Sequence, residues 1–408
     1  MIIWFIHQYA VLPGAPGGTR HFSTARRLVR QGHTVRIVAS SFHYSSQHET
    51  RQFESGVSTR EEVDGVQFEW IKTRPYRGNS IGRLWNMLSY AARALATGPY
   101  PGEGPPDVVM GSSPQPFAAL AGWRLARRHG ARFVYEVRDL WPQTLLELGR
   151  TSRWNPAVLV FGWIERHCLR RADQVVTLLP GSVDYLVAHG AARAKVTWVP
   201  NGVDLAMAGP VRPMPGRSEC VFLYAGAIGQ ANGLGAVLDA AALLSARASA
   251  IRIEIMGQGP ERARLEAQAV ERGLGNVRFR DAVPKSAVHD ALAGADAFLM
   301  ILTDSPVFRH GVSPNKLFDY MAAGRPVVFA VNTPIDPVAE AGAGFRADPS
   351  SPESLAAAME RVARLPVEER AAMGMRGRRY VEAHHDVEEL AKRFGRALDG
   401  VASPAGHL

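Results

Sequence analysis

Short apolar runs alternate with longer amphipathic segments along most of the chain. The first apolar run is Ile2–Ile6, and Thr19–Gln31 then carries apolar residues at helical spacing. Apolar runs of about four to eight residues are typical of buried strands, and a repeat of about 3.6 residues is typical of helices. Further strands are predicted in the first half at Val35–Ala39, Val66–Ile71, Asp107–Met110, Phe133–Glu136, Gln174–Leu178 and Trp198–Pro200. Such alternation predicts an α/β fold with a doubly wound parallel sheet. The polar stretch His43–Arg60 has the composition of a flexible loop.

Residues 206–217 interrupt this pattern with several glycines and prolines, and we expect a linker there. The alternation then restarts, with strands expected at Val221–Ala225, Ile251–Met256, Val277–Arg280 and Ala297–Leu302. Helices are expected at Gly235–Leu244, Glu261–Arg272, Val288–Ala293, Pro352–Arg364 and Val367–Glu382. The sequence therefore predicts an N-terminal domain at 1–205 and a C-terminal domain at 218–385. Residues 386–400 are expected to form a helix that packs back on the first domain.

The composition of the 408 residues is that of a globular protein, with 46% hydrophobic and 21% charged residues. Cys168 and Cys220 form neither a CxxC motif nor a Cys/His array, so we expect no disulfide framework and no zinc site. No apolar run reaches the roughly 18 residues that a spanning helix needs. The N-terminal apolar run lacks a preceding basic region and is interpreted as a strand, so a cytoplasmic location is expected.

The positive charge of the chain is concentrated in its first half. Residues 1–200 contain 24 Lys and Arg against 14 Asp and Glu, whereas the whole chain has 47 and 38. In the same half, Arg83–Thr97 and Trp141–Arg171 mix basic, aromatic and apolar residues in amphipathic patterns. Such segments can lie in a membrane interface, so we predict peripheral binding to the anionic inner face of the cell membrane. Helices that face the core, within a merely arginine-rich sequence, are the alternative.

The stretch Phe308–Phe329 carries the strongest chemical signal. A polar, glycine-bearing loop leads to Pro314, which suits the first turn of a helix, and Val327–Phe329 is the strand that follows. The helix N-terminus and Lys316 then lie together, and this combination favours a phosphate or diphosphate. Asp319 on the same helix can accept hydrogen bonds from hydroxyls, so the stretch predicts a nucleotide or nucleotide-sugar site. A capped helix with solvated charges is the alternative.

Two other glycine-bearing loops follow predicted strands, where ligands of open α/β sheets bind. The loop His7–His21 contains Gly17 and Gly18 and precedes a helix, which makes it a second candidate for a phosphate or a sugar. It does not match GxGxxG, and no acidic residue follows at the expected distance, so a dinucleotide fold has weak support. The loop Tyr224–Asn232 begins the second domain with a tight turn. Ordinary flexible loops are the alternative for both.

The segment Tyr135–Pro142 places Glu136, Arg138 and Asp139 at the carboxyl end of a strand, where catalytic side chains are frequent. Asp139 could accept a proton or hold a hydroxyl. Its other interpretations are a helix N-cap and an ion pair with Arg138.

The order and spacing of these motifs resemble the retaining glycosyltransferases of family 4, which have the two-domain GT-B fold. The resemblance covers essentially the whole chain and rests on HQYAVLPGAPGGTRHF, YEVRDLWPQTLLELG, PNGVD, LYAGAIG and GVSPNKLFDYMAAGRPVV. The first two motifs look like a branch that assembles bacterial surface polysaccharides, such as O-antigen, capsule or exopolysaccharide, on a lipid carrier, and are similar to N-acetylfucosamine transferases. The resemblance implies two Rossmann-like domains that face each other across a cleft.

The motifs and the resemblance together give the candidate site residues. On the donor side these are Gly17, Gly18, Gly226, Gly229, Arg309, Gly311, Val312, Ser313, Asn315, Lys316 and Asp319. On the acceptor side they are His7, Tyr9, Arg20, Glu136, Arg138 and Asp139. Catalysis is expected to depend on Lys316, Asp139 and Asp319. Lys316 and the Val312–Ser313 backbone match the diphosphate cradle of the family, Asp319 matches its ribose-binding acid, and no metal or other cofactor is expected.

The chain departs from the family pattern at two places. The first acidic residue of the E-x7-E motif corresponds to Gly311, and only the second, Asp319, is present. Where many members have Arg and Lys in the loop after the first donor-domain strand, this chain offers Ile228 and Asn232. We therefore expect Lys316, Arg309, loop amides and the helix dipole to meet the diphosphate charge.

The resemblance implies transfer of a sugar, such as an N-acetylated deoxyhexosamine, from a nucleotide-sugar, expected to be UDP-linked. The implied acceptor is a hydroxyl of a polyprenyl-diphosphate-linked glycan, the anomeric configuration is retained, and no nucleic acid takes part. A nucleotide-sugar epimerase of the same architecture and a non-catalytic nucleotide-sugar binding protein stay open as alternatives. A nicotinamide oxidoreductase is the weakest alternative, because the glycine fingerprint and its acidic partner are absent.

Overall fold

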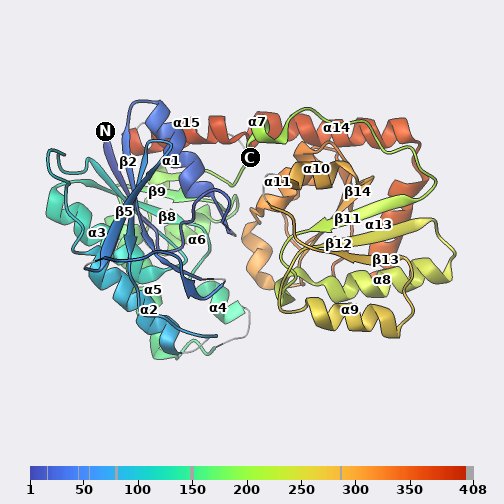
Figure 1. The fold of residues 1–408 in the computed structure, drawn as a ribbon, viewed down its shortest axis with the longest axis horizontal. Coiled ribbons are helices and arrows are strands. Elements are labelled where there is room, and N and C mark those ends of the chain that lie inside the picture. Colours follow the sequence, from blue (N-terminus) through green and yellow to red (C-terminus); the bar gives the residue numbers. More distant parts are fainter. Residues whose placement is uncertain are drawn as a thin grey trace. The chain divides into compact units, whose positions relative to one another are not determined.

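The structure is a computed structural model of the chain, and it describes residues 1–15, 17–44, 46–54, 56–78, 81–147, 151–284 and 287–400. The chain divides into two compact parts. Unit 1 comprises Met1–Pro200 together with the chain from Glu388 onward, and unit 2 comprises Asn201–Val387. Each unit is a parallel sheet covered by helices on both faces (Figure 1), which confirms the predicted fold class of two doubly wound α/β domains.

The sheet of unit 1 has the strand order β10-β9-β8-β7-β1-β2-β6-β5, and all neighbours pair in parallel except β5 and β6. Its strands are β1 (Ile2–Ile6), β2 (Thr34–Ser40), β5 (Ser58–Val63), β6 (Val66–Ile71), β7 (Val108–Ser112), β8 (Arg132–Val137), β9 (Gln174–Thr177) and β10 (Val196–Trp198). The helices are α1 (Arg20–Arg30), α2 (Ile81–Ala94), α3 (Pro116–His129), α4 (Gln143–Glu147), α5 (Pro156–Arg171), α6 (Val183–Ala188) and α15 (Val387–Asp399). A separate hairpin joins β3 (Phe42–His43) to β4 (His48–Glu49).

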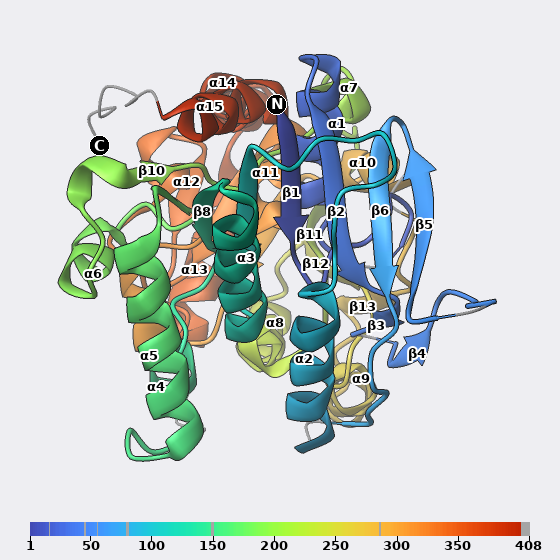
Figure 2. The same cartoon turned by 90° about the vertical axis from the view of Figure 1, so that its left-hand side faces the viewer.

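The strands of unit 1 are apolar on both faces because each face is covered by helices. In β1, Trp4 and Ile6 pack with α2, α3 and α5, whereas Ile3 and Phe5 pack on the opposite face with α1 and α15. Figure 2 shows α2, α3 and α5 along one flank of this sheet. The last helix, α15, contributes Leu390, Phe394 and Leu398 to the core of unit 1.

The prediction of a flexible loop at His43–Arg60 is wrong over its last part. The segment Ser58–Val63 forms β5, an edge strand that pairs antiparallel with β6. Its sequence STREEV is polar because an edge strand exposes much of its surface, so apolar alternation could not reveal it. The last strand of unit 1 is also displaced, since β10 is Val196–Trp198 and not Trp198–Pro200.

The sheet of unit 2 has the order β13-β12-β11-β14-β15-β16 and is parallel throughout, with Leu223 opposite both Glu254 and Phe298. Its strands are β11 (Cys220–Ala225), β12 (Ile251–Met256), β13 (Val277–Arg280), β14 (Ala297–Ile301), β15 (Val327–Ala330) and β16 (Gly344–Arg346). Its helices include α7 (Leu205–Ala208), α8 (Leu234–Ala246), α9 (Arg262–Glu271), α10 (Val288–Ala293), α11 (Asn315–Ala322), α12 (Pro337–Glu340), α13 (Pro352–Arg364) and α14 (Val367–His384). Helices α8 and α13 cover one face of the sheet, and α10, α11 and α14 cover the other.

The division between the units lies at Pro200–Asn201, ahead of the expected linker at 206–217. That segment is attached to unit 2 by the packing of α7 and by hydrogen bonds from Arg325. Residues Leu205–Ala208 form α7, and the buried guanidinium of Arg325 donates to the carbonyls of Arg212 and Pro213 at 3.0 and 2.9 Å. Glycines and prolines therefore mark an irregular segment that packs on a domain, not a free connection.

Candidate active site

The ammonium group of Lys316 occupies the carboxyl end of β11 in unit 2. Its Nζ donates to the hydroxyl of Tyr224 at 2.8 Å and to Oδ1 of Asn232 at 2.6 Å. Among the described residues, no carboxylate forms an ion pair with it. Desolvation by the surrounding protein lowers the pKa of Lys316 to about 7. An ammonium has three donors, so two neutral partners leave one N–H and most of the charge for a ligand.

Lys316 belongs to the first turn of α11, whose N-terminus is open to an anion. Pro314 occupies the N-cap and supplies no side-chain cap, and no acidic residue lies in the first turn. The neighbouring Ser313 already accepts from the backbone of Asn201 at 2.8 Å through its Oγ. Exposed N–H groups and the helix dipole therefore reinforce Lys316 at one point, as the sequence pattern predicted.

Gly311 adopts a backbone conformation that explains why no carboxylate side chain occupies this position. It follows a 3-10 helix at Pro306–His310, and its φ of 89° and ψ of 175° lie in a region that residues with a Cβ rarely adopt. A glutamate at this position would strain the turn that leads into α11. The departure from the E-x7-E pattern thus coincides with a backbone conformation that favours glycine.

Two loops press together beneath Lys316. A Cβ on Gly257 would lie 1.8 Å from the carbonyl oxygen of Gly226, and a Cβ on Gly259 would lie 2.2 Å from that of Ile228. The loop after β12 therefore supports the loop after β11 by direct backbone contact. Ile228 itself is fully buried, which agrees with the expectation that other groups meet the diphosphate charge.

The other donor-side candidates lie on or near this loop pair. Asn315 and Arg309 are exposed, Asp319 is half-buried on α11, and Val312 packs into the core below the helix. Gly226 lies against Lys316, since a Cβ there would be 3.5 Å from Nζ, whereas Gly229 begins the turn that carries Asn232. The structure therefore brings Gly226, Lys316 and the N-terminus of α11 together.

In unit 1, the candidate residues gather around the buried carboxylate of Glu136 at the end of β8. Arg20 Nε donates to it at 3.0 Å, His21 Nε2 lies 2.7 Å from it, and the Ser112 hydroxyl donates a further hydrogen bond. We call Glu136, Arg20, His21 and Ser112 the Glu136 cluster. Burial pushes the pKa of Glu136 upward, but His21, Arg20 and Arg138 outweigh it and hold that pKa well below its ordinary value.

Arg20 and Glu136 use their polar atoms inside the protein. Arg20 also donates to the carbonyls of Val199, at 2.8 Å, and Pro200, so it ties α1 to the end of unit 1. Both side chains are almost fully buried, and they therefore shape the acceptor-side region from below. The role of this pair in contacting an acceptor stays a prediction.

His7 and Arg138 lie above the Glu136 cluster. The ring of His7 stacks on that of His21 with centroids 3.9 Å apart, and Arg138 Nη1 donates to His7 Nε2 at 3.0 Å. Burial, helped by His21 and Arg138, lowers the pKa of His7 well below its ordinary value, so the imidazole is neutral at physiological pH. A Cβ on Gly18 would lie 3.7 Å from Arg138 Nη2, which places the glycine-rich loop next to this guanidinium.

Asp139 is exposed at the rim of the same region. Asp139 is not the N-cap of a helix, because α4 begins only at Gln143, and no ion pair joins it to Arg138 in the described part of the chain. Both structural alternatives are therefore wrong, and the carboxylate of Asp139 is accessible to a ligand.

Tyr9 lines a cavity of about 250 Å³ whose walls come from residues 8–13 and 15, the end of β2, the β3–β4 hairpin with the two residues after it, and Trp70. Its walls are mainly apolar and aromatic, with Val11, Phe42 and Tyr44 among them. Gly17 borders this region, since a Cβ there would lie 3.4 Å from Val11 and 3.5 Å from the Tyr44 hydroxyl. The acceptor-side candidates therefore combine a polar cluster with an apolar pocket.

Several residues of these sites were not selected from the sequence. They are His21, Ser112, Tyr224, Asn232, Gly257 and Gly259. The pattern of a strand followed by GQG, at residues 257–259, could have predicted the loop that supports the loop after β11. Tyr224 and His21 gave no such signal, because only the folded chain brings them to Lys316 and Glu136.

Two features are absent from the described residues. No cluster of three or more His, Cys, Asp or Glu side chains is arranged to hold a metal ion. None of the described helices combines the length and the hydrophobicity of a transmembrane span.

The fold as a whole matches solved GT-B glycosyltransferases. Sucrose-phosphate synthase from Thermosynechococcus elongatus superposes with a TM-score of 0.72 over 97% of both chains, at 16% identity. The Anabaena protein HepE, solved in complex with UDP and glucose, superposes with a TM-score of 0.66 at 16% identity, covering 98% of this chain and 99% of its own. Both comparisons establish the GT-B fold.

Sequence comparison identifies the family. Residues 17–202 match the glycosyl transferase 4-like domain, and residues 219–364 match glycosyl transferases group 1. The chain is 26% identical over 384 residues to the "Putative colanic acid biosynthesis glycosyl transferase WcaI" of Escherichia coli (strain K12), covering 90% of this chain and 92% of that protein. The chain thus belongs to the family 4, group 1 glycosyltransferases, which confirms the family part of the resemblance.

Proposed function

We propose that the protein is a retaining glycosyltransferase that moves a sugar from a UDP-sugar to a hydroxyl of a polyprenyl-diphosphate-linked glycan. The observation that carries the proposal is Lys316, a partly buried ammonium held by neutral oxygens at an uncapped helix N-terminus. This arrangement suits a diphosphate. The complexes of HepE with UDP and with UDP-glucose support UDP as the carrier. The E. coli relative supports a role in polysaccharide assembly. The resemblance of the N-terminal motifs makes an N-acetylated deoxyhexosamine one candidate sugar.

The geometry supports a mechanism in which the diphosphate is the group that the protein stabilises. The bond between the anomeric carbon and the diphosphate oxygen breaks, and the negative charge that develops falls beside Lys316 and the N-terminus of α11. Donors fixed in advance at such a position lower the barrier most. Asp319, on the same helix, is assigned to the ribose hydroxyls.

The acceptor hydroxyl completes the reaction on the face from which the diphosphate departs. Its oxygen bonds to the anomeric carbon, and its proton passes to the departing phosphate oxygen, so UDP leaves and the configuration is retained. We assign the orientation of this hydroxyl to the exposed Asp139 and to Arg138, above the Glu136 cluster. Neither a protein nucleophile nor a metal ion is needed in this scheme.

A surface on unit 1 supports a lipid-linked acceptor. The large apolar side chains Ile81 and Trp85 on α2, and Trp154, Leu159 and Trp163 at α5, are between 50% and 75% exposed. Arginines accompany these tryptophans, with Arg153 5.0 Å from the ring of Trp154 and Arg74 6.0 Å from that of Trp85. Neither helix exposes a carboxylate, because the acidic side chain of α5, Glu165, is buried. Tryptophan with arginine on one flank suits the interface of an anionic bilayer.

The transfer reaction tests the proposal. UDP-N-acetylhexosamines, including UDP-N-acetylfucosamine, would be incubated with a polyprenyl-diphosphate-linked sugar, and mass spectrometry would follow the elongated lipid. We expect acceptor-dependent release of UDP, with the anomeric configuration of the donor kept in the product by NMR. Modified sugar nucleotide formed without acceptor would instead indicate an epimerase. Tight binding without turnover across the donors would indicate a binding protein.

Liposome co-sedimentation tests the membrane surface separately. The wild type should bind vesicles that contain anionic lipid at low salt and dissociate as salt rises, since this attraction is screened. Replacing Trp154 and Trp163 together by serine should weaken binding at least several-fold, whereas V270S, at another exposed apolar position on α9, should not. Equal binding of all three proteins would contradict the assignment of this surface.

A further inference from the structure

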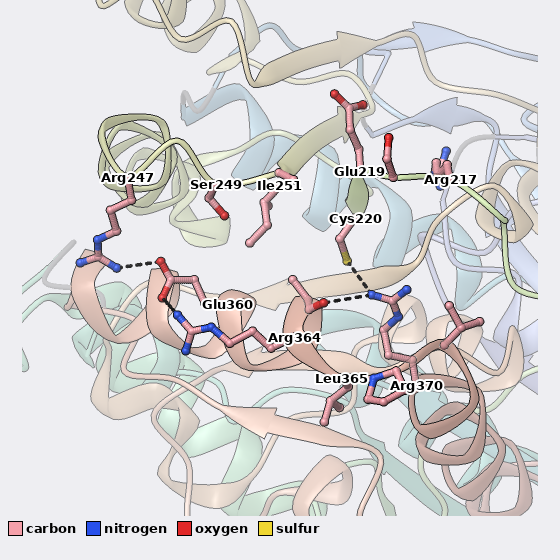
Figure 3. Close-up of a pocket in the computed structure, with 15 residues that line it drawn as sticks. Arg217, Glu219, Cys220, Arg247, Ser249, Ile251, Glu360, Arg364, Leu365 and Arg370 are labelled. Carbon is pink, nitrogen blue, oxygen red and sulfur yellow. Dashed lines mark hydrogen bonds and ion pairs between the residues drawn. The ribbon is translucent and has the colours of Figure 1, made fainter.

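A cavity in unit 2 lies at the amino ends of β11 and β12, away from Lys316. It has a volume of about 720 Å³ and is bordered by the junction of α13 and α14 (Figure 3). Because β11 runs from Cys220 to Ala225, the length of that strand, about 16 Å, separates this cavity from the donor-side residues. We call it the arginine cavity, after the lining side chains Arg217, Arg247, Arg364 and Arg370.

The carboxylates near the arginine cavity do not balance its four arginines. Arg217 pairs with Asp296 at 2.9 Å. Arg247 and Arg364 share the single carboxylate of Glu360, at 3.0 and 2.8 Å. The lining residue Glu219 pairs with Arg252, which is not part of the cavity wall. The arrangement leaves a net positive charge around a space large enough for a small organic molecule.

Arg370 carries the largest part of this excess. Its side chain is buried, with 8% of the residue exposed, and no described carboxylate forms an ion pair with it. Nη1 donates to the carbonyl of Ala363 at 3.3 Å and lies 3.7 Å from Cys220 Sγ. Among the described residues, neither its Nε nor its Nη2 has a hydrogen-bond partner. A buried guanidinium without a counter-ion destabilises the unliganded protein. An anion bound in the cavity would compensate this charge.

The backbone around Arg370 favours an anion as well. The cavity wall includes Pro366 and Val367, at the N-terminus of the 18-residue helix α14, and Pro366 supplies no side-chain cap. The first-turn acids Glu368 and Glu369 are exposed and are not part of the wall. Unsatisfied N–H groups and the positive end of the helix dipole therefore border the same space as Arg370.

We propose that the arginine cavity binds a phosphate-bearing small molecule, a phosphate monoester on a polar body of sugar size. Arginine forks match phosphate oxygens in pairs, and three of them, Arg247, Arg364 and Arg370, are incompletely neutralised here. A lone phosphate would leave most of the space unfilled, which points to an attached polyol. This site is separate from the donor diphosphate site and does not depend on the reaction proposed above.

Binding can be measured in the Lys316→Ala background, which disables the donor diphosphate site. Isothermal titration would use ribose 5-phosphate as the probe, with inorganic phosphate and free ribose as its two halves. We expect saturable, one-to-one binding of ribose 5-phosphate, weaker binding of phosphate and no binding of ribose. R370Q should weaken the ribose 5-phosphate affinity at least tenfold and the exposed variant R364Q a few-fold. R379Q, an exposed arginine on the same helix, should leave it unchanged.

R364Q keeps the test valid if R370Q misfolds, because Arg364 is 75% exposed and its loss leaves the core intact. Circular dichroism and the unliganded melting temperature would establish that each variant is folded. The proposal is overturned if ribose 5-phosphate shows no saturable binding. It is equally overturned if R370Q and R364Q both bind as tightly as R379Q.

Discussion

In unit 1, the buried carboxylate of Glu136 is surrounded by Arg20, His21 and the Ser112 hydroxyl, whereas in unit 2 the ammonium of Lys316 is surrounded by neutral oxygens of Tyr224 and Asn232. Both groups lie at the carboxyl ends of parallel strands. The first charge is compensated within the protein, and the pKa of Glu136 is held low. The second is not, and the pKa of Lys316 falls to about 7.

The contrast distinguishes a charge that maintains structure from a charge that awaits a ligand. A compensated buried ion stabilises its surroundings, and its removal leaves the partner groups unpaired. An uncompensated buried ion costs stability in the free protein, and its removal lowers that cost while binding is lost. Truncation at the two positions should therefore change stability in opposite directions.

The largest effect on stability is expected for Glu136→Ala. Removing the carboxylate leaves Arg20 and His21 buried without their counter-ion, which should lower the free energy of unfolding by about 3–5 kcal/mol. Urea denaturation followed by circular dichroism measures this change. Glu54→Ala, an exposed acid of the same unit, is the matched control and should change stability by less than about 0.5 kcal/mol. Equal stability of the two variants would show that the Glu136 cluster is not compensated as described.

The largest effect on activity is expected for Lys316→Ala. Loss of a donor aimed at developing charge should lower kcat by about 100- to 1,000-fold, while the melting temperature stays equal or rises. A steady-state transfer assay and a thermal melt on the same preparation measure both. R379Q should match the wild type in both. A Lys316→Ala protein with wild-type turnover, or one that is unfolded, would contradict the claim that the charge of Lys316 serves a ligand and not the structure.

A substitution in the loop after β12 is expected to have a smaller effect, on both stability and UDP binding. Gly257→Ala should destabilise the protein by more than about 1 kcal/mol and weaken UDP binding, because its Cβ would collide with the carbonyl of Gly226. Gly235→Ala in α8 is the control, since no atom lies within 4 Å of its Cβ, and it should be neutral or slightly stabilising. Thermal melts and UDP titration compare the two. A Gly257→Ala protein that binds UDP like the wild type would show that the contact between the two loops does not support UDP binding.

The dependence on pH follows from the lowered pKa of Lys316. Since desolvation lowers it to about 7, the free protein carries a mostly neutral amine above pH 7, and a diphosphate must restore the proton. UDP affinity should fall as pH rises from about 7 to 9, by at most about tenfold per pH unit, with proton uptake on binding. In the same window stability should rise, because the unfolded chain keeps the lysine protonated. Titration in buffers of different ionisation enthalpy measures the uptake, which Lys316→Ala should abolish.

The smallest effect is expected from metal removal. We expect transfer rates to stay within about twofold of the untreated protein after dialysis against EDTA, because the proposed mechanism assigns the diphosphate charge to Lys316 and α11. The transfer assay, with and without added magnesium, measures this. A loss of activity that magnesium restores would show that a metal ion shares the role given to Lys316.

Local patterns in the sequence were sufficient for the framework and for the position of Lys316 at the start of a helix. Apolar runs mark the buried strands because parallel sheets hide both faces, and Pro314 with Lys316 marks the helix start beside a loop. The partners of the charges were not predictable, since Tyr224 and Asn232 lie 92 and 84 residues from Lys316 along the chain. The polarity of β5 hid a strand, and the conformation of Gly311 is visible only as a backbone angle.

The equilibrium affinity for UDP, measured in the wild type, Lys316→Ala and R379Q at pH 7, tests the central claim most directly. If the diphosphate supplies the missing counter-charge of Lys316, Lys316→Ala should bind UDP at least tenfold more weakly, and R379Q should bind it as the wild type does. Equal affinity in all three folded proteins would contradict the claim that this ammonium group is the diphosphate site.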